Sequence, residues 1–440
     1  MFSLASAVFD KLIRQGMTFR KYLRELDVSE FKTPEEIREL QDIKLRRLIR
    51  HCYENVPFYR ELFDSLKLTP DDIRTGEDLK KLPFIDKKTI RNNFDKFIAR
   101  NMNKALAVKA ETSGSTGEPA LFLRDYRSVN FENAVLWRFR RAAGGNNTRK
   151  LVLRGDIVAP VDRKTPPFWK HDPVRRELVM SSYHLNDENL GSYIEEIKRF
   201  RPEVIYGYPS SIYLLARLMA KRGASIRLKA IFTSSESISA NQRELIEEVF
   251  GGTVYDWYGQ VERVASIGQC EKGTYHIIED YSITELVETD AGLEVVGTNL
   301  NNYIMPLIRF RTADIVTLSE KRCTCGRHFR EVEKIKGRGL NYIYSPEGNR
   351  LSLFLASDSI DYDNNVSEVQ FVQLKKGELI VNIVKNDRFT EKDGQKIIRS
   401  IKEHTSPDMA VILNEVDKIP RGSNGKVVNS IIEITGEDWI

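Results

Sequence analysis

The segment Thr112–Pro119 reads TSGSTGEP and combines glycines with small hydroxyl residues, the types that hold phosphate groups through the backbone. Glycine lets backbone N–H groups turn toward an anion, and Ser and Thr add donors without blocking its approach. No Gly-Lys-Ser/Thr follows, so this is not a Walker loop. A phosphate-binding loop and an ordinary flexible hairpin loop are both open at this point. The candidate phosphate ligands are Thr112, Ser113, Gly114, Ser115, Thr116 and Gly117.

A second group of residues has the types that bind zinc: Cys270, His276, Cys323 and Cys325. Three sulfur ligands and one imidazole suit a closed tetrahedral site, which is structural because no position stays open. The pair Cys323 and Cys325 is less diagnostic than Cys-x-x-Cys, and His328 is an alternative to His276. The other interpretation is two buried thiols and a surface pair. Cys52 has no partner in sequence and is expected in the core of its helix.

The elements that must position such residues are clearest in the middle of the chain. Apolar periodicity predicts helices over 192–199 and 210–223, and a third begins at Ser239, with Gln242 three residues on as a capping box. Short apolar strands alternate with them over 203–207, 228–233 and 253–257. This alternation indicates a parallel sheet with helices on its faces.

Polar loops follow these strands, and ligands of such sheets bind at the carboxyl ends of the strands. We therefore expect the loops 206–210, 233–236 and 258–262 to meet at one edge. Tyr206 and Tyr208 follow a strand end and are candidates for the wall of a substrate pocket, although aromatic residues at such spacing are more often core.

The two ends of the chain have different patterns. The first hundred residues read as helices, including one over 37–54 that Pro57 ends and a basic helix after Leu82-Pro83. From about Asn341 the pattern is strand, strand, helix, strand, which predicts a compact α+β unit. We expect an N-terminal domain over 1–338 and a C-terminal domain over 339–440. The predicted fold class is α/β, with mixed and parallel sheets flanked by helices in the large domain.

Composition excludes several classes of protein. Of the 440 residues 41% are hydrophobic and 30% charged, which is ordinary for a globular enzyme, and the 68 basic and 63 acidic residues are interleaved. A nucleic-acid partner is not expected, since such proteins concentrate their basic residues in a patch. No stretch approaches the roughly 20 apolar residues of a membrane span. The N-terminus lacks the basic region of a signal peptide, and four cysteines do not suggest a disulfide framework, so we expect a cytoplasmic protein.

Together with further motifs, the loop at Thr112 is similar to the signature of the acyl-adenylate-forming superfamily, which includes acyl-CoA synthetases, luciferases and peptide-synthetase adenylation domains. Three further segments match in the correct order, Tyr258–Glu262 (YGQVE), Arg311–Asp314 (RTAD) and Pro420–Lys426 (PRGSNGK), and Thr233–Glu236 falls where the family has its adenine-facing loop. Each alone resembles a common surface turn. All of them in the correct order along most of the chain are hard to ascribe to chance.

The resemblance implies a role for individual residues. Glu262 would help hold magnesium, Asp314 would bind the ribose hydroxyls of ATP, and the catalytic Lys426 would swing in for adenylation. Tyr258 would pack near the adenine. Further nucleotide contacts are expected from Ser235, Glu236, Gly259 and Arg338.

Within the superfamily the sequence most resembles the branch of phenylacetate–CoA ligases and CapK-type proteins of capsular polysaccharide biosynthesis. The resemblance includes the stretches 50–60 and 78–83, and relatives in this branch often carry a similar Cys/His set, which favours structural zinc. The hinge departs from the family: Gly-Arg-x-Asp-Asp is usual, whereas Gly337–Asn341 reads GRGLN. Arg338 is kept, and Leu340 replaces the acidic pivot.

The sequence thus predicts an ATP- and magnesium-dependent ligase that forms an acyl-adenylate from a carboxylic acid and passes the acyl group to an amine or to coenzyme A. A role in surface-polysaccharide biosynthesis is the favoured context, and an acyl-CoA ligase of the phenylacetate type is the alternative. An inactive nucleotide-binding protein is less well supported, because Glu262 and Lys426 are both present. A zinc-dependent nucleic-acid binder is disfavoured by the dispersed charge.

Overall fold

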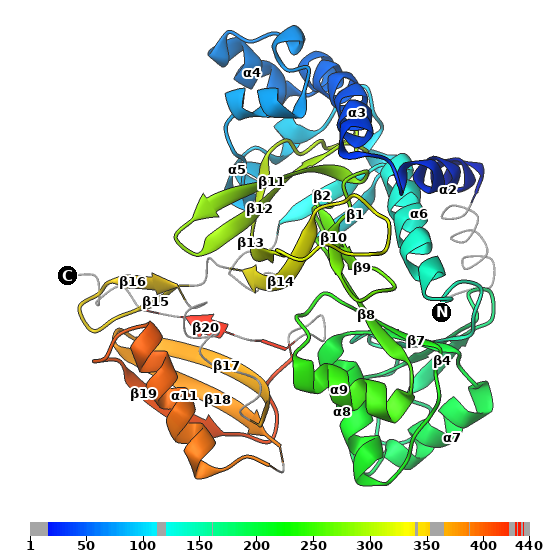
Figure 1. Ribbon diagram of the computed structural model, residues 1–440, viewed down its shortest axis with the longest axis vertical. Helices are drawn as coiled ribbons and strands as arrows, with labels where there is room; N and C mark the ends of the chain where they lie inside the picture. The colour runs from blue at the N-terminus through cyan, green and yellow to red at the C-terminus, as the bar shows by residue number, and fades with distance from the viewer. Residues whose placement is uncertain are drawn as a thin grey trace.

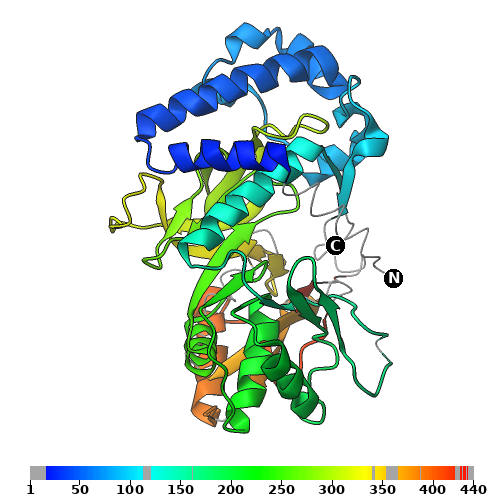
Figure 2. The same cartoon turned by 90° about the vertical axis from the view of Figure 1, so that its right-hand side faces the viewer.

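The computed structural model describes residues 16–111, 120–160, 162–338, 342–352, 365–386, 388–421, 427–428, 430–432 and 434 (Figures 1 and 2). A helical region, a large sheet with its helices and a small C-terminal sheet follow one another along the chain. The predicted α/β fold class, with a small α+β unit at the C-terminus, is confirmed. The domain boundary at 338/339 stays a prediction.

The N-terminal region is helical, as predicted. Its helices are α2 (Met17–Ser29), α3 (Pro34–Asn55), α4 (Pro57–Leu66) and α5 (Lys87–Asn92), with the short 3-10 helices η1 (Pro70–Asp72), η2 (Gly76–Lys81), η3 (Phe94–Phe97) and η4 (Lys104–Leu106). A capping box at Thr33 begins α3. Pro57 both ends α3 and opens α4 at its first position, where a missing N–H costs nothing.

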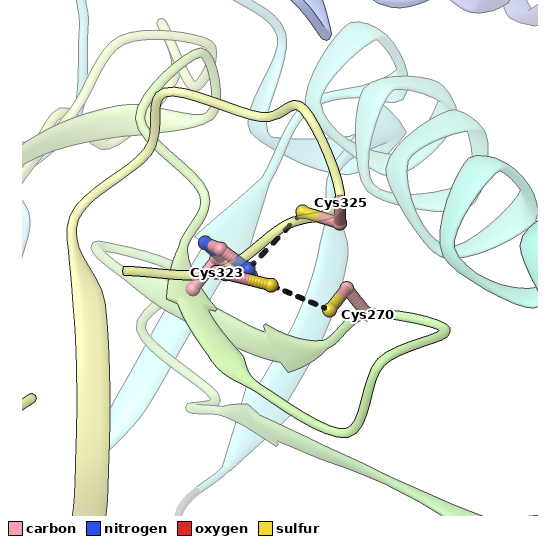
Figure 3. Close-up of side chains that lie close together, drawn as sticks. Cys270, Cys323 and Cys325 are labelled. Carbon is pink, nitrogen blue, oxygen red and sulfur yellow. Dashed lines mark hydrogen bonds between the residues drawn. The ribbon is translucent and has the colours of Figure 1, made fainter. Parts of the chain in front are cut away.

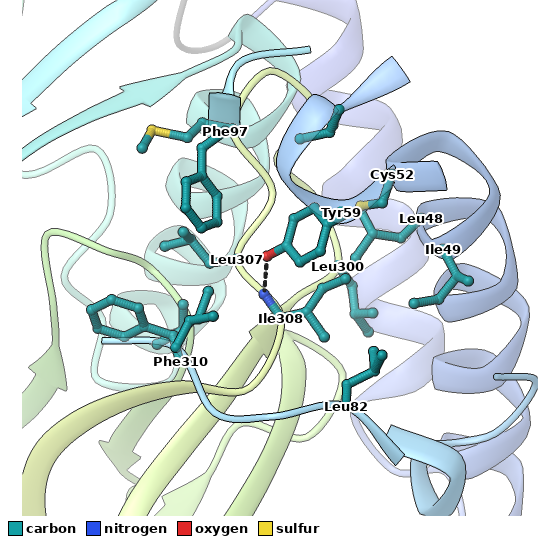
Figure 4. Packing of buried hydrophobic residues seen from close by; sticks show 14 of the residues in the cluster. Leu48, Ile49, Cys52, Tyr59, Leu82, Phe97, Leu300, Leu307, Ile308 and Phe310 are labelled. Carbon is teal, nitrogen blue, oxygen red and sulfur yellow. Dashed lines mark hydrogen bonds between the residues drawn. The ribbon is translucent and has the colours of Figure 1, made fainter. Parts of the chain in front are cut away.

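A core cluster joins these helices to the loop that precedes strand β13 (Phe310–Leu318) (Figure 4). Tyr59 of α4 is 1% exposed. Its hydroxyl donates to the carbonyl of Pro306 at 3.1 Å and accepts the N–H of Ile308 at 2.9 Å. This loop is thereby fixed against the helices, which is how the N-terminal region supports the sheet.

In the part of the chain that the structure describes, one mixed sheet of twelve strands lies at the centre of the molecule. Its spatial order is β11 (Ser282–Thr289), β12 (Gly292–Asn299), β13 (Phe310–Leu318), β14 (Glu331–Arg338), β10 (Tyr275–Ile277), β9 (Ser266–Gln269), β8 (Thr253–Gly259), β7 (Ala230–Ser234), β6 (Val204–Gly207), β3 (Lys150–Leu153), β5 (Glu177–Met180) and β4 (Trp169–Asp172). Strands β5, β3, β6, β7 and β8 are parallel, and the others pair antiparallel.

Helices cover both faces of the parallel part. The three predicted helices are α7 (Leu190–Phe200), α8 (Pro209–Lys221) and α9 (Ala240–Phe250), and they pack on one face through an apolar cluster. The other face packs against α6 (Tyr126–Ala142), whose Phe139 contacts the rings of Phe232 and Trp257. Ser239 and Gln242 form the predicted capping box of α9. Helix α6 was not predicted.

The C-terminal unit has the predicted order of elements. Strands β17 (Val366–Lys375) and β18 (Glu378–Lys385) form a hairpin, α11 (Glu391–His404) follows, and β19 (Ala410–Glu415) pairs parallel with β18. A further strand, β20 (Ser430–Ile432), pairs with β17. The small hairpin β15 (Tyr342–Tyr344) and β16 (Arg350–Ser352) precedes this sheet. Among the described residues, no helix is long and apolar enough to cross a bilayer.

Candidate active site

The predicted polar loops do meet at the carboxyl edge of the parallel strands. β6, β7 and β8 are neighbours in the sheet and run the same way, so the loops after Gly207, Ser234 and Gly259 leave from one edge. Ser235 has φ of 73°, in the left-handed region that non-glycine residues rarely adopt. The backbone is therefore held in a specific turn where the predicted nucleotide loop begins.

Glu236 connects this edge to the C-terminal unit. One carboxylate oxygen accepts the N–H of Ser210, in the first turn of α8, at 3.1 Å, where the positive end of the helix dipole favours a negative charge. The other accepts the N–H of Val427 at 3.4 Å. Lys426, the predicted catalytic lysine, lies outside the described residues, but the residue that follows it contacts the predicted nucleotide loop.

The C-terminal sheet makes two further contacts near this edge. Ser367 of β17 exchanges a hydrogen bond with Tyr213 of α8 at 3.2 Å, and its carbonyl accepts from the side chain of Gln242 of α9 at 3.3 Å. The segment around Val427 is itself anchored to β17, because the side chain of Gln370 donates to the carbonyl of Val428 at 2.8 Å. The C-terminal unit is thus seated on the N-terminal ends of α8 and α9.

Tyr258 and Asp314 form a second part of the site. The Tyr258 hydroxyl donates to the Asp314 carboxylate at 2.7 Å and accepts from the Gln260 side chain at 2.8 Å. Burial, reinforced by the Asp314 charge, raises the pKa of Tyr258 well above its usual value. The sequence predicted both residues at the nucleotide, and the structure brings them into contact.

An irregularity in β13 presents Asp314. The register between β12 and β13 shifts near Thr312, and Ala313 has φ of 65°. The N–H of Ala313 is bound by the buried Glu294 carboxylate at 3.0 Å. Asp314 stands opposite Arg338 in the ladder with β14, so the backbone of the predicted hinge begins beside the predicted ribose ligand.

Glu262, the predicted magnesium ligand, is paired with a lysine. Its side chain is 5% exposed, and Lys87 Nζ lies 3.1 Å from its Oε1. Lys87 opens α5, a helix that Asp86 caps by accepting the N–H of Thr89. Sequence reasoning missed Lys87, although the basic helix after Leu82-Pro83 was the pattern that could have indicated it.

The predicted phosphate loop, Thr112, Ser113, Gly114, Ser115, Thr116 and Gly117, lies outside the described residues, as does Leu340. Its two flanking strands are described and antiparallel, β1 (Val108–Glu111) and β2 (Leu121–Arg124), with Glu111 opposite Leu121. Arg124 at the end of β2 donates to the carbonyl of Val261. The hairpin that carries the loop is therefore attached next to Glu262.

The two tyrosines of the predicted substrate pocket lie in different surroundings. Tyr206 is buried in a cluster with Phe232 on the α6 face, and its hydroxyl donates to the carbonyl of Gly145 at 3.0 Å. Tyr208 is half-buried at the start of α8 and near enough to Glu236 for that charge to contribute to a raised pKa, whose main cause is burial. A pocket role for both stays a prediction.

The Cys/His set is brought together away from this edge. Figure 3 shows its three cysteines close to one another. Cys270 follows β9, His276 is in β10, and Cys323 and Cys325 lie between β13 and β14; their ligand atoms are within 4.8 Å of one another. Cys270 Sγ lies 3.6 Å from Cys323 Sγ, and Cys325 Sγ lies 3.5 Å from His276 Nε2. Ligands of tetrahedral zinc at about 2.3 Å are separated by about 3.7 Å, so this spacing fits the ion. The exposed His328 is not in the cluster.

Comparisons with known proteins find similarity to CapK and to phenylacetate–coenzyme A ligases. A family model described as the CapK C-terminal domain matches residues 343–433. Protein CapK of Staphylococcus aureus is 26% identical over 96% of this chain and 95% of its own length. A phenylacetate–coenzyme A ligase of Thermus thermophilus is 26% identical over 89% of this chain and 96% of its own.

Solved structures share the fold. A 2-hydroxyisobutyryl-CoA ligase in the postadenylation state superposes with a TM-score of 0.69 at 16% identity, covering 92% of this chain and 91% of that one. The same ligase in the thioesterification state covers equal shares with a TM-score of 0.57. The arrangement of the whole chain is therefore more similar to the postadenylation structure.

Proposed function

Because this chain belongs to the acyl-adenylate-forming superfamily, in its phenylacetate–CoA ligase and CapK branch, and is an ATP-dependent, AMP-forming acid ligase, we propose that it acts in surface-polysaccharide biosynthesis by activating a small carboxylic acid. The acid is joined to an amine or a thiol in a second step. The contact of Val427 with Glu236 carries the assignment of the site, since it brings the neighbour of Lys426 to the carboxyl edge of the sheet.

Each group at this edge has a task in adenylate formation. A carboxylate oxygen of the acid bonds to the α-phosphorus of ATP, the bond from that phosphorus to the bridging oxygen breaks, and pyrophosphate leaves. Two anions must approach each other, so cations and N–H donors lower the barrier. Lys426 offsets the charge at the α-phosphate, the Thr112–Gly117 loop holds the departing phosphates, and Asp314, held by Tyr258, binds the ribose.

Magnesium fits the donor that the site offers. The ion is commonly bound through one or two carboxylates together with substrate phosphates, and it shields the phosphate charge when bound. Glu262 supplies a buried carboxylate whose partner in the protein is a cation, Lys87, so a metal ion and the ammonium group compete for one position.

The acceptor distinguishes two forms of the proposal. Leu340 replaces the acidic hinge residue, so the second conformation, which presents the acceptor, differs from that of the usual CoA ligases, and this favours an amine and an amide product. Similarity to phenylacetate–coenzyme A ligases favours coenzyme A and a thioester. An amine requires only a route to the adenylate and a group or water to take its proton.

The experiment is an ATP–pyrophosphate exchange screen over many acids, followed by amines and coenzyme A as acceptors of the best acid. Lys426→Ala should abolish exchange and leave transfer from supplied acyl-adenylate largely intact, since only the first step needs a cation at the α-phosphate. Lys418→Ala, at an exposed lysine eight positions earlier, is the matched control. Absence of exchange with every acid would overturn the proposed activation of a small carboxylic acid, and equal loss of both steps in Lys426→Ala would remove the role assigned to Lys426.

We also propose structural zinc at Cys270, His276, Cys323 and Cys325. Elemental analysis of protein purified without chelator should give about one zinc per chain. His276→Ala should lose the metal and His328→Ala should keep it. Metal-free protein, or the reverse pattern in the two variants, would contradict this site.

A further inference from the structure

The guanidinium of Arg140 lies over the ring of Tyr206, and the charge of a second arginine, Arg154, acts on both residues. Arg140 is in the last turn of α6, and its guanidinium lies over the Tyr206 ring, 4.5 Å from the ring centre. Arg154 directly follows β3 and is exposed. It is close enough to Arg140, Tyr206 and Tyr208 for its charge to lower the pKa of each.

The two acids whose charges act on Arg140 have other partners. Glu177 accepts a hydrogen bond from Lys150 Nζ at 3.1 Å, and Glu132 is bonded by the Tyr281 hydroxyl. Within the described part of the chain, Arg140 Nε is buried with no hydrogen-bond partner, and no ion pair is formed by Arg154. Burial lowers the pKa of Arg140, which reflects the cost of a charge that is not neutralised.

This pair is next to the proposed adenylation site. Arg154 follows Leu153, whose carbonyl accepts the N–H of Tyr208 at 3.1 Å. Tyr208 in turn is near Glu236, which is bound by the N–H of Val427. A substrate whose carboxylate reaches the α-phosphate of ATP at this edge would extend toward the two guanidinium groups.

Resting on the proposed ligase function, we propose that Arg140 and Arg154 bind a second anionic group on the acid substrate, so that the enzyme activates acids that carry two negative charges. The planar guanidinium group offers donors in a fork that matches carboxylate and phosphate oxygens. An anion here would satisfy Arg140 Nε and neutralise two neighbouring positive charges at once. Either a carboxylate or a phosphate supplies this chemistry.

The test compares paired acids in ATP–pyrophosphate exchange. Glutarate is paired with its monomethyl ester, and 3-phosphoglycerate with glycerate, so that each pair differs in the second anion. The wild type should prefer the doubly charged member, and one pair should show the larger ratio of kcat/KM, which separates carboxylate from phosphate. Arg154→Ala and Arg140→Met should reduce that ratio about ten- to a hundredfold, the effect of losing hydrogen bonds to a charged group.

The ratio of kcat/KM between the two acids of a pair distinguishes a loss of anion recognition from misfolding, because a misfolded variant would lose kcat/KM for both acids alike. Lys221→Ala, at a solvent-exposed lysine of α8, is the control and should keep the wild-type ratio. As a readout without catalysis, glutarate or 3-phosphoglycerate alone should raise the melting temperature of the wild type more than that of Arg154→Ala. Equal kcat/KM for the two members of each pair in the wild type, or the same ratio in the wild type and in Arg154→Ala, would overturn the inference. Where exchange fails, an equal rise in melting temperature of the wild type and of Arg154→Ala would also overturn it. Absence of exchange with any acid would instead contradict the ligase function.

Discussion

The backbone N–H of Val427 donates to the carboxylate of Glu236 across 191 positions of sequence, at 3.4 Å. The same carboxylate caps α8 through Ser210. One acidic side chain thus holds the loop after β7, the N-terminus of a helix and the segment that follows Lys426. A carboxylate with two N–H donors is already satisfied, which explains how a charged group is accommodated half-buried at this edge.

Glu236→Ala is expected to release the C-terminal segment and slow adenylate formation about tenfold or more, because a hydrogen bond to a charged group contributes about 1.5–3 kcal/mol. Glu236→Gln keeps one acceptor oxygen, so its rate of adenylate formation should lie between those of the wild type and Glu236→Ala. The measurement is exchange with the best acid beside acyl transfer from supplied adenylate, and transfer should change little. Glu244→Ala, on the exposed side of α9, is the control. Equal activity of Glu236→Ala and wild type in both steps would show that the contact has no part in adenylation.

Local patterns predicted the elements around this site and not their pairing. The strands and helices between 190 and 259 follow strong periodicity, and the capping box at Ser239 marked the start of α9 correctly. Helix α6 was missed because polar residues such as Asn130 and Asn133 interrupt its apolar face. The pairing of β10 with β14 joins segments far apart in sequence, and no local pattern carries that information.

The residues of the candidate site were also predicted only in part. Motif order correctly brought Tyr258 and Asp314 to one place, although their hydrogen bond depends on an irregularity in β13 that sequence does not show. The Cys/His set was found from residue type and was favoured by the family resemblance, and the structure brings Cys270, His276, Cys323 and Cys325 together. Lys87 and the arginine pair were not found, since a lysine or arginine in a charged surface pattern looks the same whether it is solvated or buried against a distant partner.

Substitution of Lys87 tests whether its ammonium group and a magnesium ion compete for the Glu262 carboxylate. In Lys87→Met the buried carboxylate loses its cation, and the free energy of unfolding should fall by about 1–3 kcal/mol in the absence of metal. Magnesium should then raise the melting temperature of the variant more than that of the wild type, because the ion takes the vacated position. Lys88→Met, at the exposed neighbouring position, should behave as the wild type. An identical response of both variants to magnesium would show that Glu262 does not bind the ion.

Ala313 is held at φ of 65°, where a Cβ atom is unfavourable. Ala313→Gly should relieve this strain and raise the free energy of unfolding by about 0.5–1 kcal/mol, after the greater freedom of glycine in the unfolded chain is subtracted. Denaturant unfolding measures the change. Ala220→Gly, at an exposed helical position of α8, should have the opposite sign, with a loss of about 0.5–1 kcal/mol. A loss in Ala313→Gly as large as that in Ala220→Gly would mean that the left-handed conformation is not a strain in solution.

A buried ion pair should determine how the free energy of unfolding falls at acid pH. Asp280 accepts two hydrogen bonds from Arg138 of α6, at 2.6 and 2.8 Å, and a third from Ser29 of α2 at 2.5 Å. Although burial opposes ionisation, the Arg138 charge and these hydrogen bonds lower the pKa of Asp280 below its usual value. A carboxyl whose pKa is lower in the folded chain stabilises it at pH above about 4, the unfolded value, and this stabilisation is lost as pH falls through the folded value.

Asp280→Asn should therefore cost about 3–5 kcal/mol of unfolding free energy at pH 7, because Arg138 is left buried without its counter-charge. The gap between variant and wild type should narrow as pH falls below about 4, since the wild type then loses the same charge by protonation. Urea midpoints at pH 7, 4 and 3 measure both effects. Asp64→Asn removes one half of an exposed pair with Arg60, and it should change stability by less than about 1 kcal/mol at every pH. A difference between Asp280→Asn and wild type that stays constant from pH 7 to 3 would show that ionisation of Asp280 does not govern stability. The loss would then come from the NH2 group that replaces an acceptor oxygen facing Arg138.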